Sequence, residues 1–311
     1  MKKIRFKKIL RRAVPLWLVV VILFDASLIV GIGEYLFLKK KFNQDILALK
    51  EASKSPVEFV QILKQQVIPQ KGYTTSLKWK SLGKELVGIG AIDKEKYQEI
   101  FTSDCNGGKE MKYLDGSWDH NIHINEQNSR FIVNTFWALG LVNKSKVMGE
   151  MRKENGEDTA NFASTGGWIL GSKEPMEIYS SAEIISLTDE QQELVKSIAE
   201  NVYRPCCGNS TAFPDCNHGM AALGYIQLAV KEGLPEKQIY RDLLAFNSYW
   251  FPQNYVEMAA FFSRENTKWD KVDPKLALSQ DYSSASGVQR IRQEISDMPG
   301  FQVEGGGGCG A

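Results

Sequence analysis

Three of the chain's five cysteines lie in one stretch, NVYRPCCGNSTAFPDCNHGM, which spans residues 201–220. They are Cys206, Cys207 and Cys216, and His218 follows two residues after the last of them. Thiolate and imidazole groups are the ligands that Zn²⁺ and copper ions take in proteins, and a thiolate is also a nucleophile. The stretch therefore predicts a metal site, with zinc or copper as the ion, although its spacing C-C-x8-C-x-H matches no standard zinc finger.

The helices on either side of this stretch should position its sulfur atoms. Cys206 and Cys207 are expected where one helix ends, and Asp215 is expected to be the N-cap of the next, with Cys216 in its first turn. The free backbone N–H groups and the helix dipole at that point favour a thiolate over a thiol. Adjacent cysteines reach one small ion with difficulty, so one of the pair is expected to have another role.

Two other interpretations of the cysteines stay open. In an exported protein, a Cys207–Cys216 disulfide would connect the two ends of the loop and serve only structure. Alternatively, Cys216 is the nucleophile of a thiol-dependent enzyme, activated by the helix start and by His218, with Cys207 as the resolving thiol. The residue types do not decide whether the chain has any catalytic turnover.

The other two histidines, His120 and His123, lie in the segment SWDHNIHINEQN. They share one face only if the segment is helical, because a spacing of three matches a helical turn. Asp119 could then orient an imidazole through its second nitrogen. The sharpest hypothesis brings both histidines to the cysteine stretch as additional metal ligands. Two further cysteines are possible participants, Cys105 in SDCNGG and Cys309 in a glycine-rich end, although a terminal thiol is more simply one without a role.

Several common kinds of site have no support in the sequence. There is no H-E-x-x-H pattern for a metalloprotease, no P-loop lysine or strand–GxGxxG–helix context for a nucleotide, and no G-x-S-x-G frame around Ser164. Residues 1–50 carry 11 Lys and Arg against 3 Asp and Glu, which leaves 27 against 34 in the rest of the chain. A nucleic-acid partner is therefore not expected, because the body of the protein lacks a cationic bias.

The basic excess belongs to an amino-terminal membrane signal. Residues 1–12 are a basic tail, and the mostly apolar residues 13–38 are long enough to cross a bilayer as a signal anchor. The heavier positive flank predicts a single-pass protein of the cell membrane, with its amino end in the cytoplasm and its main domain outside. Asp25 within the run and Lys39–Lys41 beyond it are unfavourable features, and cleavage near Ala26-Ser27 is the alternative.

The rest of the chain predicts a mainly α fold. A helical stalk at 39–54 leads to one irregular helical domain at 55–300 with loop-rich insertions, and residues 301–311 are a flexible glycine-rich tail. Helices are expected from Pro56, on both sides of Asp93, from Asn125 or Asn128, after the capping box of Thr188 and Gln191, and from Pro235. Residues 161–171, NFASTGGWILG, are expected to form a short hairpin.

Four segments of the chain carry a resemblance to a known group. They are HINEQNSRFIVNTFWALGLVNKS, NFASTGGW, YRPCCGNSTAFPDCNHGMAALG and YWFP, within roughly residues 100–255. Together they resemble an uncharacterised group of membrane-anchored bacterial proteins to which no activity is attached. The resemblance implies that Cys206, Cys207, Cys216 and His218 belong to one coherent motif, and it implies no reaction.

Overall fold

The computed structural model describes residues 32, 34–35, 55–104, 109–116 and 118–301 of the chain. Contacts divide the chain into a unit of residues 1–55 and a unit of residues 56–311. The basic tail, almost all of the anchor, the stalk, Cys105 and Cys309 lie outside the described residues. Within the described part, no helix combines the length and the apolar character that a membrane crossing requires.

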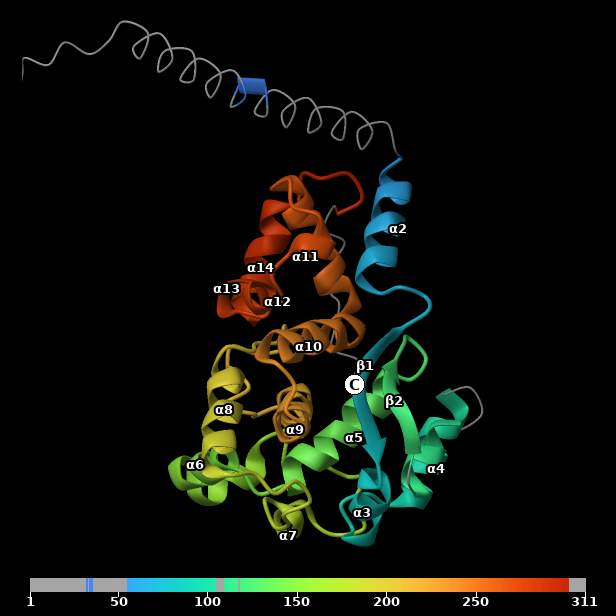
Figure 1. The fold of residues 1–311 in the computed structure, drawn as a ribbon, viewed down its shortest axis with the longest axis vertical. Coiled ribbons are helices and arrows are strands. Elements are labelled where there is room, and N and C mark those ends of the chain that lie inside the picture. Colours follow the sequence, from blue (N-terminus) through green and yellow to red (C-terminus); the bar gives the residue numbers. More distant parts are fainter. Residues whose placement is uncertain (1–31, 33, 36–54, 105–108, 117, 302–311) are drawn as a thin grey trace, which may run out of the picture. The chain divides into compact units, whose positions relative to one another are not determined.

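The second unit is mainly helical, as the sequence predicts, and Figure 1 shows its elements. In chain order they are α2 (Pro56–Val67), β1 (Tyr73–Lys80), α3 (Leu82–Gly88), α4 (Lys94–Asp104), η1 (Lys109–Leu114), β2 (Trp118–Ile124), α5 (Ser129–Val142), α6 (Lys146–Asn155), η2 (Gly156–Asn161), α7 (Pro175–Ile178), α8 (Asp189–Glu200), α9 (Asn217–Lys231), α10 (Glu236–Trp250), α11 (Pro252–Arg264), η3 (Trp269–Lys271), α12 (Pro274–Ala277), α13 (Gln280–Ser283) and α14 (Ala285–Glu294).

Helices α5 and α9 pack directly against each other in the core. Both are buried along most of their length, in agreement with apolar sequences that leave no polar face. Their backbones meet at two glycines. A Cβ atom on Gly140 would lie 2.1 Å from the carbonyl oxygen of Met220, and one on Gly224 would lie 2.4 Å from that of Phe136. Only glycine permits this approach, and the contact holds α9, whose N-cap is Cys216, against the core.

Most predicted helix starts are confirmed. Thr188 accepts a hydrogen bond from the backbone N–H of Gln191, whose side chain bonds the N–H of Thr188 in return, so the capping box is complete. Asp93 accepts bonds from the first N–H groups of α4, and α2 begins at Pro56. Asn128 precedes the first residue of α5. These starts could be predicted because a cap depends on residues three or four apart.

One local expectation is wrong, because residues 161–171 form a succession of turns and no hairpin. Phe301 is buried and packs edge-on against Phe59, with ring centroids 6.5 Å apart. The rest of the expected flexible tail, residues 302–311, lies outside the described residues.

The two strands form an antiparallel pair that the sequence analysis did not expect. β1 pairs with β2 with Tyr73 opposite Ile124 and Thr74 opposite His123, and the register shifts twice along the ladder. Strand β2 contains both histidines of the SWDHNIHINEQN segment. In a strand, residues three apart point to opposite faces of the sheet. His120 and His123 therefore lack the helical spacing that would place them on one face, because pairing with β1 holds their segment extended.

Candidate metal and thiolate site

The loop between α8 and α9 folds back on the end of α8. The backbone N–H of Thr211 donates to the carbonyl of Val202 at 2.8 Å, and that of Ala212 donates to Ala199 at 3.2 Å. Helix α8 ends at Glu200, so Cys206 and Cys207 lie in a turn of the loop and not at a helix end. The fold-back returns this turn to the start of α9.

Cys216, and not Asp215, is the N-cap of α9. Its backbone is extended, and its Sγ accepts a hydrogen bond of 3.4 Å from the N–H of Gly219. Sulfur thus takes the place that a serine or aspartate oxygen usually takes at a helix start. The consequence is that the helix dipole and a free N–H group both act directly on this sulfur.

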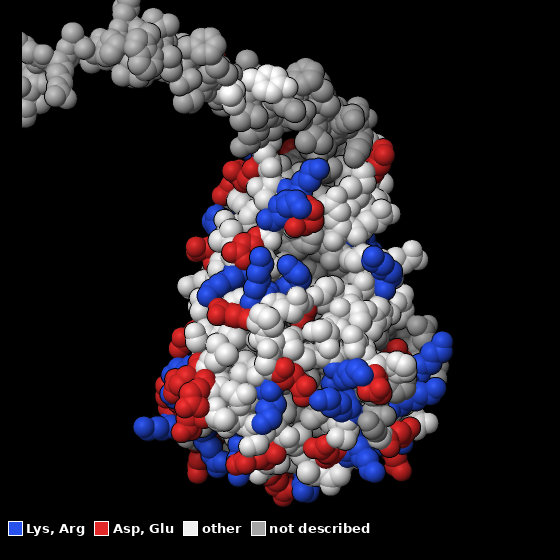
Figure 2. Space-filling model, in the orientation of Figure 1, with Lys and Arg blue, Asp and Glu red and all other residues white. Residues whose placement is uncertain are grey.

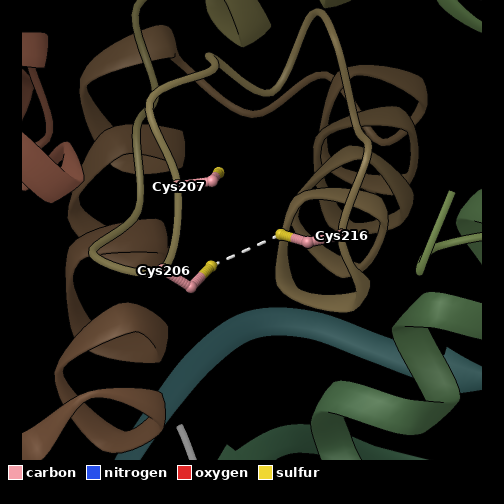
Figure 3. A group of neighbouring side chains, drawn as sticks. All are labelled: Cys206, Cys207 and Cys216. Atoms are coloured by element: carbon pink, nitrogen blue, oxygen red, sulfur yellow. Dashed lines mark hydrogen bonds between the residues drawn. The ribbon is translucent and has the colours of Figure 1, made fainter. Parts of the chain in front are cut away.

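Figure 3 shows the Sγ atoms of Cys206 and Cys216 pointing toward each other, with Cys207 next to Cys206 on the same segment of the loop. The three Sγ atoms lie within 4.8 Å of one another, and those of Cys206 and Cys216 are 3.4 Å apart. All three are free thiols and half-buried. Three sulfurs around one zinc ion are spaced about 3.8 Å apart, given a Zn–S bond of about 2.3 Å. The cluster is therefore compatible with a bound metal ion, and equally with a disulfide.

Arg204 is the principal polar contact of this cluster. Its side chain is 1% exposed, and its Nε donates to Sγ of Cys216 at 3.0 Å. The other two guanidinium nitrogens donate to the carbonyl oxygens of Asn209 and Phe213 and, at 2.6 Å, to the carboxylate of Asp215. A single buried side chain thus joins the two ends of the loop and places a positive charge against the sulfur of Cys216.

Gly219 leaves the space that the guanidinium occupies. A Cβ atom at this position would lie 2.5 Å from Cζ of Arg204, well inside any permitted contact. A side chain at the third residue of α9 would therefore displace the guanidinium from its present position against the cluster. This contact gives a physical reason for the glycine in the C-x-x-G part of the sequence, DCNHG.

The three sulfurs differ in proton affinity. Hydrogen bonds from Cys206 and Cys207, together with the charge of Arg204, hold the pKa of Cys216 well below the ordinary thiol value. Hydrogen bonds to Cys207 and Cys216, reinforced by burial, raise the pKa of Cys206. Cys216 is therefore the most acidic thiol of the group, and Cys206 holds its proton more firmly. A thiolate is the form that binds metal and attacks electrophiles.

The carboxylate of Asp215 is fully engaged next to the cluster. One oxygen accepts from Arg204, and the other accepts from Nδ2 of Asn209 at 2.7 Å. Because both Asp215 oxygens are occupied by these bonds, the sulfur atoms are the ligand atoms that remain available to a metal ion, and they are soft donors. Soft donors of this kind select ions such as Cu(I) and Zn²⁺ over Mg²⁺ or Ca²⁺.

His218 lies close to the sulfurs in sequence, but its side chain packs against aromatic rings. Its imidazole is 5% exposed and packs on the ring of Phe251 at 4.3 Å and that of Trp250 at 5.8 Å. Burial lowers the pKa of His218 to about 4, so the ring is neutral. In the described residues, the group of possible metal-binding atoms within 4.8 Å of one another contains the three sulfurs and no histidine.

The histidines of β2 make contacts of their own. Nδ1 of His123 lies 2.9 Å from Oγ1 of Thr74 on the neighbouring strand. Asp119, expected to orient an imidazole, pairs instead with Lys78 at 2.7 Å. Neither His120 nor His123 belongs to the sulfur group, so the structure does not bring the two segments together in one centre.

Comparison of the chain with protein-family models, curated proteins and solved structures returned no match. The chemistry of the loop must therefore be inferred from its own geometry. Reasoning from the sequence missed Arg204, the residue with the most contacts in the site. Its position directly before Pro-Cys-Cys is the one signal that could have drawn attention to it.

Proposed function

We propose that the cluster of Cys206, Cys207 and Cys216 binds one thiophilic ion, Zn²⁺ or Cu(I), for storage, delivery or a structural purpose. The observation that supports this proposal is the convergence of three sulfur atoms within 4.8 Å. Such an ion, when bound, would join the two ends of the loop. The chain's own residues would bind it through sulfur and restrict access to it by half-burial.

The charge of Arg204 supports this proposal. Three thiolates around an ion of charge +1 or +2 carry a net negative charge, which is costly in a half-buried site. A guanidinium that donates to one of the sulfurs compensates that charge, and hydrogen bonds from outside the ligand set commonly tune a metal site. Asp215 in turn balances Arg204 when the site has no ion.

The test is metal analysis of the full-length protein purified under reducing conditions. Wild type should hold close to one equivalent of zinc or copper, and Cys216→Ser should hold a small fraction of it. Lys84→Gln is the control, because it removes an exposed side chain of α3 that takes no part in the cluster, and it should hold as much metal as wild type. A folded, reduced wild-type protein that binds neither ion would exclude the proposal.

A second candidate is thiol–disulfide exchange, which the 3.4 Å separation of Cys206 and Cys216 favours. The thiolate of Cys216 would attack a substrate disulfide, form a mixed disulfide and release one substrate thiolate. Cys206, after losing its proton to solvent, would then displace the second substrate thiol and form the Cys206–Cys216 disulfide. A reduced dithiol partner would be needed to restore the site. Turnover of a small disulfide by the metal-free protein, absent in Cys206→Ser, distinguishes this activity from metal binding.

We also propose that the site faces the outside of the cell from a membrane tether. The apolar residues 13–38 and the basic residues before them support this proposal. The expected result is that the protein sediments with membranes and that external protease removes residues 55–300 from intact spheroplasts. Recovery of the whole protein in the soluble cell fraction would contradict it.

A further inference from the structure

A cavity of about 1010 Å³ opens beside α10, away from the sulfur cluster. It lies between α10, the segment 269–275 and Gln66 of α2, and none of its lining residues belongs to the cluster. Its volume is at the upper end of the range of about 300–1,000 Å³ that small-molecule sites occupy. The cavity is therefore large enough for a ligand of metabolite size.

One wall of the cavity is a single face of α10. It carries Lys237, Tyr240, Arg241 and Leu244, whose spacing of three and four residues places them side by side on a helix. Tyr240 and Leu244 are buried, at 2% and 8% exposed, while Lys237 and Arg241 are exposed. The wall thus has an apolar floor and a cationic rim.

The carboxylates around the cavity are already engaged. Glu236 pairs with Lys275 at 3.2 Å, Asp270 pairs with Lys271 at 3.2 Å, and Asp273 caps α12. Figure 2 shows Lys and Arg side chains gathered over α10 and α12. Of the basic residues that line the cavity, Lys237 and Arg241 form no ion pair within 4.0 Å in the described part of the chain. Two cations at the mouth of the cavity are therefore available to an anion.

Two further groups point to a ligand that also contains a ring. The ring of Tyr240 is buried at the floor of the cavity, where Nζ of Lys275 lies 5.1 Å from the ring centroid and the hydroxyl interacts with Lys275 and Glu236. Trp269, half-buried in η3, lines the cavity and offers an aromatic surface. Aromatic side chains combine a large apolar contact area with a defined geometry.

We propose that this cavity binds a small anion that carries a ring, such as a sugar phosphate or a sugar acid. Arg241 and Lys237 contact the phosphate or carboxylate through charge-assisted hydrogen bonds. The Tyr240 hydroxyl bonds a polar substituent of the ring, and Trp269 packs against its face. The site is separate from the sulfur cluster, so it does not depend on the metal proposal.

The test is isothermal titration of the full-length protein in detergent with four probes: glucose 6-phosphate, glucuronate, glucose and inorganic phosphate. We expect one of the first two to bind at least tenfold more tightly than glucose and than inorganic phosphate. Which of the two binds more tightly identifies the anion. The proposal is overturned if neither binds with a dissociation constant below about 1 mM, a binding free energy of about −4 kcal/mol, or if glucose or inorganic phosphate binds as tightly as the better of the two.

Variants assign the contacts. Arg241→Gln should weaken binding of the preferred probe about tenfold or more, as expected for a lost charged hydrogen bond. Lys84→Gln, which removes an exposed lysine of α3 outside the cavity, is the matched control and should bind as wild type does. Tyr240→Phe and Trp269→Ala should weaken the sugar anion while leaving inorganic phosphate unchanged. Equal affinities of wild type and Arg241→Gln would overturn the assignment, with thermal melts confirming that both are folded.

Discussion

Nε of Arg204 donates a hydrogen bond of 3.0 Å to Sγ of Cys216, and the guanidinium that makes this bond is 1% exposed. The bond couples the stability of the loop to the charge state of its most acidic thiol. A buried arginine needs acceptors for all of its nitrogens, and it finds them in the loop backbone, in Asp215 and in the sulfur. Removing either partner should therefore affect both folding and reactivity.

Replacing Arg204 by glutamine should lower the free energy of unfolding by about 3 kcal/mol, because it leaves Asp215 and two carbonyl groups without their buried partner. It should also raise the pH at which Cys216 is alkylated by iodoacetamide, since the positive charge beside the thiolate is lost. Urea denaturation and alkylation rates across pH measure the two effects.

Arg264→Gln serves as the control for this variant. Arg264 pairs with Asp297 at the surface, where both side chains are well exposed, so the change should cost less than about 1 kcal/mol. An Arg204→Gln protein as stable as Arg264→Gln, with an unchanged alkylation profile, would show that the guanidinium does not control the site.

Gly219 provides a second test through the same contact. A methyl group at this position would overlap the guanidinium, so Gly219→Ala should destabilise the protein by about 1–3 kcal/mol, as overpacking does, and weaken metal binding. The identical change at Gly149, in α6 and with open space around its Cα, should instead stabilise the helix by up to about 1 kcal/mol. Thermal melts compare the two, and equal effects would contradict the close approach at Gly219.

Helices with local signals could be predicted from the sequence, and elements that depend on distant partners could not. The helix after the capping box at Thr188 and the apolar helix α5 could each be predicted from residues close together in the sequence. Strand β1 has no such signal, because its ladder partner β2 begins 38 residues after β1 ends. The extended form of the His120–His123 segment depends on that same pairing.

The sulfur cluster could be predicted only in part for the same reason. The composition of residues 201–220 identified the cysteines and the helix start beside Cys216. The closure of the loop, which brings Cys206 to 3.4 Å from Cys216, depends on bonds from Thr211 and Ala212 back to α8. From the sequence alone, Arg204 is expected at the surface, because its burial depends on the closure of the loop. The sequence suggested His218 as a metal ligand because it lies two residues from Cys216. Its packing on Phe251 could not be predicted, since Phe251 lies at a helix break more than 30 residues away.

Mild oxidation of the metal-free protein should join Cys206 to Cys216 and leave Cys207 reduced. The two sulfurs need to approach by little more than 1 Å to reach the bond length of about 2.05 Å, and Cys216 is the thiolate that attacks. With oxidised glutathione, the pair loses two electrons and two glutathione thiols form. Peptide mapping after alkylation identifies the bond. A Cys207–Cys216 bond would instead support the disulfide first considered from the sequence.

Asp242, which is not part of the sulfur cluster, should make the free energy of unfolding depend on pH. Its carboxylate is buried in α10 and accepts hydrogen bonds from Tyr73, Tyr225 and Gln238. Burial nevertheless raises its pKa above the ordinary carboxyl value, because desolvation outweighs these three bonds. A carboxyl group with a raised pKa in the folded state contributes most below the unfolded pKa, and this contribution is lost as the pH rises through the folded pKa.

The comparison of wild type with Asp242→Asn isolates this effect, since the amide has a similar shape and does not titrate. The unfolding free energy of wild type minus that of the variant should fall as the pH is raised from about 4, near the unfolded carboxyl pKa, toward neutrality. Above the folded pKa the difference should level off. Urea denaturation at a series of pH values measures it. A difference that grows with pH would mean that the hydrogen bonds from Tyr73, Tyr225 and Gln238 stabilise the carboxylate more than burial penalises it.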